Sequence, residues 1–317
     1  MQRILDPGQI EAFAERSVPR IRLPDPAGLF ERRAQRLIEL SEGHAVGGYL
    51  RLMAAVGEAQ QRALENLVRP GRTGSFREIV QRIATSSAQS RAHRMPLIQA
   101  AGWQRDQVWR AILRDLAQTI KSLTGFPAAV GVVCERLIEA KGDSIEAQAD
   151  LLLTAHTEDV DAEAAPFVMA ALQVYWTAMS SNLKVSDVAQ LDVPTVCPVC
   201  GTLPVASVVR ADQRSPGYRY LNCALCSTEW HMVRITCSHC LNNEGIAYHS
   251  IEGGAEAIRA ESCGKCHTYR KILYQEKDPR VEPVADDLAS LALDLLMTQE
   301  GYHRGSGNPL LWQHTDS

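Results

Sequence analysis

The cysteines are the residues whose type and spacing point most directly to chemistry. Eight of the nine lie within 70 residues and form four C-x-x-C pairs. The first quartet is Cys197, Cys200, Cys223 and Cys226, and the second, 40 residues further on, is Cys237, Cys240, Cys263 and Cys266. Both quartets read C-x2-C-x22-C-x2-C, which indicates a tandem repeat with the same four candidate ligands in each copy.

Four thiolates in one place suit a metal ion in tetrahedral coordination, at metal–sulfur distances of about 2.3 Å for zinc. A C-x-x-C turn directs two sulfurs to one side, where backbone N–H groups of the turn can donate to them. This donor set narrows the metal to zinc or iron without choosing between them. With sulfur in all four positions no site stays open for water or substrate, which argues against hydrolysis at either ion.

The turn CPVCG at residues 197–201 is the best formed of the four. Pro198 fixes its own φ, and Gly201 accepts a left-handed conformation that a side chain resists. The turns CALCS, CSHC and CGKC lack one or both of these residues. We therefore expect them to be less rigid when no metal is bound.

Other arrangements of the same residues are possible. A single C-x-x-C pair is often a redox dithiol, but four pairs at a fixed period favour metal binding. The ligands could also cross between the repeats, although two separate quartets are simpler. Four histidines near the turns are expected to surround the sites rather than to replace a cysteine: His231, His239, His249 and His267.

Outside the quartets, little suggests chemistry. Cys134 has helical spacing with Val130 and Leu137 and is expected to be a small buried side chain. Asp286 and Asp287 look like a carboxylate pair, but are more simply the first turn of a helix, where the dipole favours acids. The sequence has no P-loop, G-x-G-x-x-G, G-x-S-x-G or H-E-x-x-H motif, so nothing marks a nucleophile or general base. We expect a protein that is not an enzyme.

The elements that must position the cysteines change character along the chain. Up to about residue 185, apolar residues recur at helical spacing, with breaks at Pro24–Pro26, Pro70–Gly71, Gly125–Pro127 and Lys141–Asp143, which predicts an all-α bundle. From about residue 191, short glycine-punctuated runs such as 204–209 and 230–235 predict strands. After Pro279 a last helix is predicted. Its expected apolar stripe is Leu288, Leu291, Ala292, Leu295 and Leu296.

Length, composition and charge limit the number of domains, the location of the protein and the kind of partner it binds. The 317 residues, 45% hydrophobic with a formal net charge of −4, suffice for about two domains. The first residues contain no secretory signal and no stretch is long enough to span a bilayer, so we expect a cytoplasmic protein without membrane insertion. Residues 197–280 hold ten Lys and Arg against eight Asp and Glu. Thiolate ligands would make this region negative, so nucleic acid is not expected as a partner.

The segments CPVCGTLPVASVV, YLNCALCSTEW, TCSHC, ESCGKCHTYRKILY and GNPLLW resemble the formate dehydrogenase accessory protein family, FdhE. The specific motifs lie in residues 195–312, and the helical part is similar in layout. The resemblance implies an α plus small β fold: an all-α N-terminal domain, two tandem rubredoxin-like (zinc-ribbon-like) four-cysteine modules and a C-terminal helix. The expected divisions are 1–190 for the helical domain, 191–235 and 236–280 for the modules, and 281–317 for a helix and tail that pack back on the body.

The same resemblance implies a function. Members of that family are cytoplasmic bacterial accessory proteins, or chaperones, that act on the catalytic subunit of respiratory formate dehydrogenase around its export. The eight cysteines would then hold two metal ions, with iron favoured over zinc. Two alternatives stay open: a rubredoxin-like electron carrier, in which iron at each quartet cycles between oxidation states, and a zinc-ribbon protein that binds nucleic acid.

Overall fold

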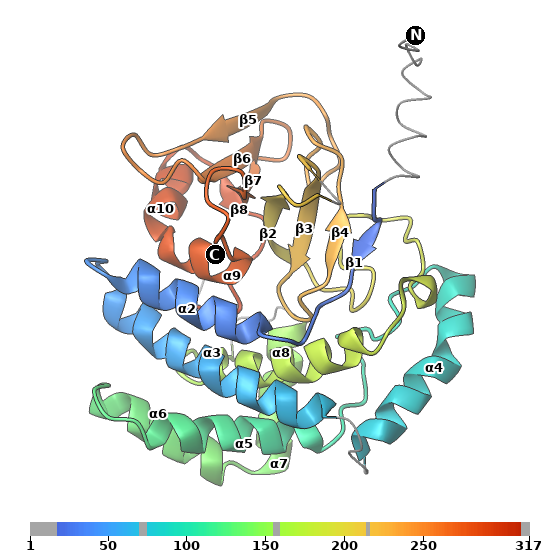
Figure 1. The fold of residues 1–317 in the computed structure, drawn as a ribbon, viewed down its shortest axis with the longest axis vertical. Coiled ribbons are helices and arrows are strands. Elements are labelled where there is room, and N and C mark those ends of the chain that lie inside the picture. The colour runs from blue at the N-terminus through green and yellow to red at the C-terminus, as the bar shows by residue number, and fades with distance from the viewer. Residues whose placement is uncertain (1–17, 70–74, 155–158, 214–215, 312–317) are drawn as a thin grey trace.

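The structure is a computed structural model that describes residues 18–69, 75–154, 159–213 and 216–311. Helices dominate residues 29–181, and most of a mixed sheet, together with two further helices, lies in residues 204–304 (Figure 1). The helices are α2 (Leu29–Ser41), α3 (Gly47–Val68), α4 (Ser75–His93), α5 (Val108–Lys121), α6 (Ala128–Glu139), α7 (Gly142–Leu153) and α8 (Ala165–Ser181), followed by a short 3-10 helix, η1 (Val185–Asp187). The predicted helical N-terminal region is therefore confirmed for the described residues.

The burial of each helix follows from its apolar pattern. In α5 the buried residues recur three and four apart, as in Trp109, Ile112, Leu116 and Ile120, so one face packs against the bundle. Helix α8 is different, because sixteen consecutive residues from Ala165 to Ser180 are buried. A helix that is buried on all sides must lie inside the molecule, and α8 contacts α3, α5 and α7.

Within the described residues the sheet has eight strands: β1 (Ile21–Arg22), β2 (Pro204–Val209), β3 (Arg219–Cys223), β4 (Glu229–His231), β5 (Ile246–His249), β6 (Ile258–Cys263), β7 (Thr268–Tyr274) and β8 (His303–Arg304). Their order is β1-β4-β3-β2-β7-β6-β5, and β8 pairs with β7. All neighbours on this path are antiparallel except β2 and β7, which run parallel with Ser207 opposite Ile272. The two cysteine repeats therefore contribute to one continuous sheet.

The 40-residue sequence period appears again in the strands. Adding 40 to the bounds of β2, β3 and β4 gives segments that overlap β5, β6 and β7 respectively. Each repeat is thus a three-stranded antiparallel unit, and the first strand of one pairs with the last strand of the other. The strand predicted over 204–209 is present. The one predicted over 230–235 ends at His231, because Ile235 takes a positive φ of 61° where the chain turns toward Cys237.

The C-terminal region contains two helices where the sequence pattern predicts one. Helix α9 (Pro283–Ala289) and helix α10 (Leu291–Gln299) are separated at Ser290, whose φ and ψ of −108° and 37° are not helical. The break redirects the second helix, so α10 buries Leu293 and Met297 while Leu295 is 67% exposed. The predicted stripe is therefore wrong beyond Leu288. Helix α9 packs against α2 and β2 and joins the helical part to the sheet.

Candidate metal centres

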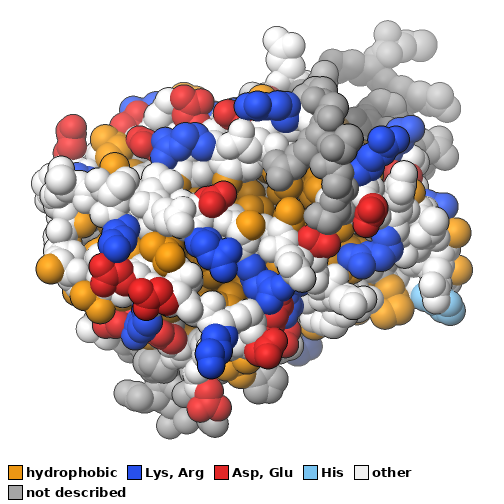
Figure 2. Space-filling view, turned by 90° about the horizontal axis from the view of Figure 1, so that it is seen from below, with side chains coloured by type: hydrophobic (Ala, Val, Ile, Leu, Met, Phe, Trp, Pro, Cys, Tyr) orange, Lys and Arg blue, Asp and Glu red, His pale blue; other side chains and the backbone are white. Residues whose placement is uncertain are grey.

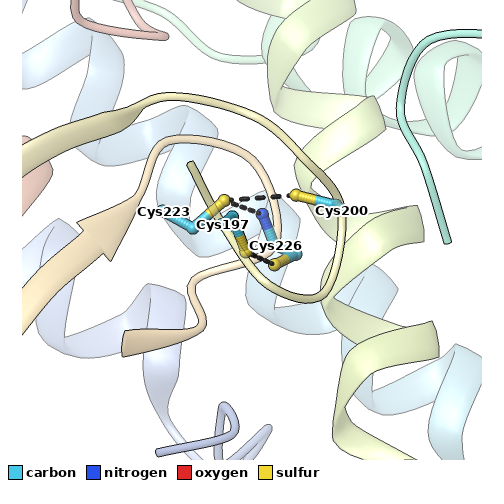
Figure 3. A group of neighbouring side chains, drawn as sticks. All are labelled: Cys197, Cys200, Cys223 and Cys226. Carbon is cyan, nitrogen blue, oxygen red and sulfur yellow. Dashed lines mark hydrogen bonds between the residues drawn. The ribbon is translucent and has the colours of Figure 1, made fainter. Parts of the chain in front are cut away.

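The first quartet forms a cluster between two hairpin turns. Cys197 and Cys200 lie in the turn before β2, Cys223 is the last residue of β3, and Cys226 lies in the turn between β3 and β4. Their sulfur atoms point toward one another (Figure 3). The Cys197–Cys226 and Cys200–Cys223 sulfurs are 3.5 and 3.4 Å apart, and all four lie within 4.8 Å of one another.

The second quartet repeats this geometry at the other end of the sheet. Cys237 and Cys240 precede β5, while Cys263 is the last residue of β6 and Cys266 lies in the turn between β6 and β7. The Cys237–Cys266 and Cys240–Cys263 sulfur pairs are both separated by 3.7 Å. These four sulfurs also lie within 4.8 Å of one another. The ligands do not cross between repeats, so two separate quartets are the arrangement found.

The sulfur separations fit a metal ion and not a disulfide. Tetrahedral coordination at about 2.3 Å places neighbouring sulfurs about 3.8 Å apart, close to the 3.4 to 3.7 Å found. A disulfide requires about 2.05 Å, and all eight cysteines are free. Each cluster is thus suited to one metal ion.

Burial of the first cluster supplies a second reason to place a cation there. Burial raises the pKa of the Cys197 and Cys200 thiols well above the ordinary value, whereas hydrogen bonds from the other three sulfurs and from Thr228 outweigh burial at Cys226 and hold the pKa of that thiol well below it. Four thiolates in one buried space repel one another, so they ionise together only if a positive charge lies between them. The donor set and its surroundings therefore fit a divalent or trivalent cation.

The backbone of all four turns has the same conformation. The residue after the second cysteine has a positive φ in each: 77° at Gly201, 57° at Ser227, 62° at Leu241 and 52° at His267. Only the first of these is glycine, the residue that adopts this region without cost. The prediction for Gly201 is confirmed, and the other three turns adopt the same shape with a side chain in place.

Hydrogen bonds to sulfur come from the backbone and from hydroxyl groups. The N–H groups of Leu225 and Cys226 lie 3.4 and 3.3 Å from the Cys223 sulfur, and those of His239 and Cys240 both lie 3.4 Å from the Cys237 sulfur. These are the donors expected of C-x-x-C turns.

Threonines two residues after a cysteine were not anticipated from the spacing of the cysteines alone. Thr202, Thr228 and Thr268 place their hydroxyl oxygens 3.0, 3.2 and 2.9 Å from the sulfurs of Cys200, Cys226 and Cys266. The fourth turn has Asn242 at this position. The sequence signal is the extension of the pair to C-x-x-C-x-T in three of the four turns.

The remaining candidate residues lie outside the clusters. Among the described residues, no histidine joins either quartet, and His249 instead contacts the Ser262 hydroxyl at 2.7 Å. Cys134 is fully buried, as predicted. Asp286 and Asp287 begin α9 but bind different groups: Asp286 pairs with Arg36 at 2.6 Å, and Asp287 pairs with Arg304. They do not form a shared carboxylate site.

The cations that would serve a nucleic-acid interface are mostly inside the protein. Arg219, Arg270 and Lys271 are at most 4% exposed. Arg210 pairs with Glu229, Lys265 is exposed, and Arg214 lies outside the described residues. On the face seen from the side of α5–α7, positive and negative side chains are interspersed rather than gathered by sign (Figure 2). No described helix has both the length and the hydrophobicity to cross a membrane.

A helical domain joined to a sheet with two four-cysteine clusters defines a class of cysteine-rich metal-binding proteins. The chain belongs to the FdhE family. It matches the family models described as "FdhE, N-terminal" over residues 18–192, "FdhE, central domain" over 196–234 and "FdhE, C-terminal domain" over 235–311.

Individual relatives support this assignment over nearly the whole chain. The sequence is 40% identical to a protein named FdhE homolog from Cronobacter sakazakii, covering 98% of this chain and 97% of that protein. It is 39% identical to the protein named FdhE from Salmonella paratyphi A, covering 96% and 95%. The crystal structure of the FdhE protein from Pseudomonas aeruginosa superimposes with a TM-score of 0.77 and 36% identity, covering 92% of this chain and 99% of that one.

Proposed function

We propose that this protein is an accessory factor for formate dehydrogenase that binds the catalytic subunit of that enzyme during maturation in the cytoplasm. Membership of the FdhE family supports this function, together with the resemblance of the cysteine segments to formate dehydrogenase accessory proteins. In this proposal the eight cysteines hold two metal ions, iron or zinc, and the rest of the protein provides a surface for the client.

The observation that carries the proposal is that both four-cysteine clusters are complete in a chain of this family. When all four positions around an ion are filled by protein sulfur, the ion cannot also bind water or substrate. Such an ion stabilises a fold or transfers electrons, and both uses suit a protein that assists another enzyme without transforming a substrate itself.

The test is complementation joined to co-purification. A bacterium that lacks its own FdhE-family gene is supplied with this protein, and formate dehydrogenase activity in the membrane fraction is measured. We expect restored activity, and recovery of the catalytic subunit with the tagged protein. The control is the same purification from cells that lack the catalytic subunit. Full expression with neither restored activity nor recovery of the subunit would contradict the proposal.

A second candidate function is electron transfer by iron, favoured by one observation: Cys240 of the second cluster is exposed. A ligand that reaches the surface shortens the path to a redox partner. This function predicts a visible absorption band that bleaches reversibly on reduction. A colourless, zinc-loaded protein that supports formate dehydrogenase maturation would exclude it.

A further inference from the structure

The two clusters differ sharply in exposure although their sulfur geometry is nearly the same. All four cysteines of the first cluster are at most 1% exposed and belong to the main hydrophobic core. In the second cluster, Cys240 is exposed and Cys266 is partly exposed. A chelator or a foreign thiolate can therefore approach the second cluster from solvent, whereas the first is reached only through the core.

Contacts with the helical domain hold both turns of the first cluster in place. The N–H groups of Ile98 and Ala100 donate to the carbonyl oxygens of Val199 and Cys200, at 2.9 and 2.8 Å. On the other turn, the side-chain amide of Gln173 in α8 donates to the Ala224 carbonyl at 2.7 Å. Releasing an ion from this cluster requires these buried hydrogen bonds to open together.

The outer turn of the second cluster is held less firmly. Arg270 donates to the Ser238 hydroxyl at 2.8 Å, but the end of the turn, at Cys240 and Leu241, faces solvent. Where the other three turns place a threonine hydroxyl about 3 Å from a sulfur, this turn has Asn242, whose side-chain amide makes only a long contact of 3.9 Å with the Cys263 sulfur.

We propose that the second cluster is the exchangeable metal centre of this protein, and that Cys240 is the ligand that opens. The inference rests on the proposed function, in which both quartets hold metal. A thiolate, carboxylate or amine donor from solvent or from another protein binds the ion as the Cys240 thiolate leaves and takes up a proton. The charge of the ion does not change, so no oxidant or reductant is required. The first cluster keeps its ion as long as the core is folded.

Metal release measures this difference directly. The full-length protein is purified without added metal or chelator, its metal content is determined by mass spectrometry, and excess pyridylazoresorcinol is added. We expect two ions per chain, one of which leaves at least about tenfold faster than the other, because opening the first cluster requires opening the core. Release of both ions at one rate would overturn the proposal.

Alkylation of the cysteines shows which cluster releases the ion that leaves fast. Iodoacetamide is added together with the chelator, and labelled cysteines are identified by peptide mass spectrometry. We expect label on Cys240 and Cys266 while the first quartet stays unlabelled. Buried Cys134, which is in neither cluster, serves as the internal control and should react only after denaturation. Label in the first quartet before the second would contradict the inference.

A matched pair of variants completes the test. Cys240→Ser should bind one ion and lose the fast phase, and Cys200→Ser, at the same position of the first repeat, should lose the slow phase. If Cys200→Ser does not fold, the pattern of labelled cysteines in the wild-type protein still shows which cluster releases its ion first. Fewer than two ions in the fresh wild-type protein would instead contradict the metal assignment of the proposed function, and with it the inference.

Discussion

Arg219 of β3 and Glu261 of β6 form an ion pair across the junction of the two repeats, with Nη2 and Oε1 2.6 Å apart and neither side chain more than 3% exposed. Arg219 also donates to the Ser207 hydroxyl and, at 2.9 Å, to the Thr236 carbonyl. The parallel pairing of β2 with β7 is thus accompanied by a buried charge–charge contact that binds one repeat to the other.

Glu261→Ala should strongly destabilise the protein, because it leaves the charge of Arg219 buried without a partner. We expect the free energy of unfolding to fall by about 3–5 kcal/mol, measured by denaturant titration. The control is the double variant Arg219→Leu with Glu261→Leu, which removes both charges and should recover most of the loss. A single variant that unfolds within about 1 kcal/mol of wild type would show that the pair contributes little.

The stability of the protein should depend on pH through Asp287. Burial opposes ionisation of this carboxyl, but the charges of Arg304 and Lys271 hold its pKa below the ordinary value. A lowered pKa in the folded state stabilises the fold above the ordinary Asp pKa of about 3.9, and this stabilisation is lost as pH falls toward the folded value.

The variant that tests this is Asp287→Asn, which leaves Asp294 as the remaining carboxylate partner of both Lys271 and Arg304. At pH 7 we expect a loss of about 1.5–3 kcal/mol, with a shallower decline in stability below about pH 4 than in wild type. Asp192→Asn is the control, because Asp192 pairs with Arg94 at an exposed site. Parallel pH profiles for wild type and Asp287→Asn would contradict the assignment.

Leu241→Gly should stabilise the second cluster. A left-handed conformation costs a residue with a β carbon about 1–2 kcal/mol. Glycine avoids this cost but loses more chain entropy on folding, which offsets about 0.5–1 kcal/mol of the gain. We expect a net gain of up to about 1.5 kcal/mol and slower release of one ion to a chelator. Leu241→Ala removes the same exposed side chain but keeps the strain, so it is the matched control. Equal release rates in the two variants would show that backbone strain does not limit exchange.

Cys197→Ala and Cys263→Ala should each reduce the metal content from two ions per chain to one, because each removes one ligand of a different quartet. The structural consequences should differ. The first cluster lies in the core shared with α8. Cys197→Ala should therefore lower the melting temperature at which the helical part unfolds, as followed by circular dichroism. Cys263→Ala should leave that melting temperature nearly unchanged.

The control for both is Cys134→Ala, a buried cysteine in neither cluster. It should keep both ions and lose about 1 kcal/mol from the small cavity it leaves. A Cys197→Ala protein that retains two ions and full thermal stability would show that Cys197 is not a ligand.

The cysteine sequence predicted both clusters correctly because each quartet depends on local turns joined by one short hairpin. The spacing of two residues within a pair and 22 between pairs is enough to specify which sulfurs meet. The helical half could also be predicted from the sequence, because the spacing of apolar residues that indicates a helix lies within a single helix such as α5.

Pairings between strands that are far apart in the sequence could not be predicted in this way. Nothing in the local pattern of Ser207 or Ile272 indicates that their strands lie side by side and parallel, nor that Ile21 pairs with Trp230. The difference in burial between Cys200 and Cys240 depends on how the helical domain covers one repeat, which identical spacing cannot reveal. At the break between α9 and α10, the Ser290 hydroxyl donates to the carbonyl oxygens of Asp286 and Asp287, which the spacing of the leucines does not indicate.

The shared sheet also has a consequence for the order in which the protein is made. Strand β2 ends at Val209, and its parallel partner β7 begins only at Thr268. During synthesis on the ribosome, the first repeat therefore leaves the exit tunnel with an unsatisfied strand edge that stays open until most of the chain has been translated. Such edges invite pairing with other chains, so premature termination within residues 210–267 should release an aggregation-prone fragment.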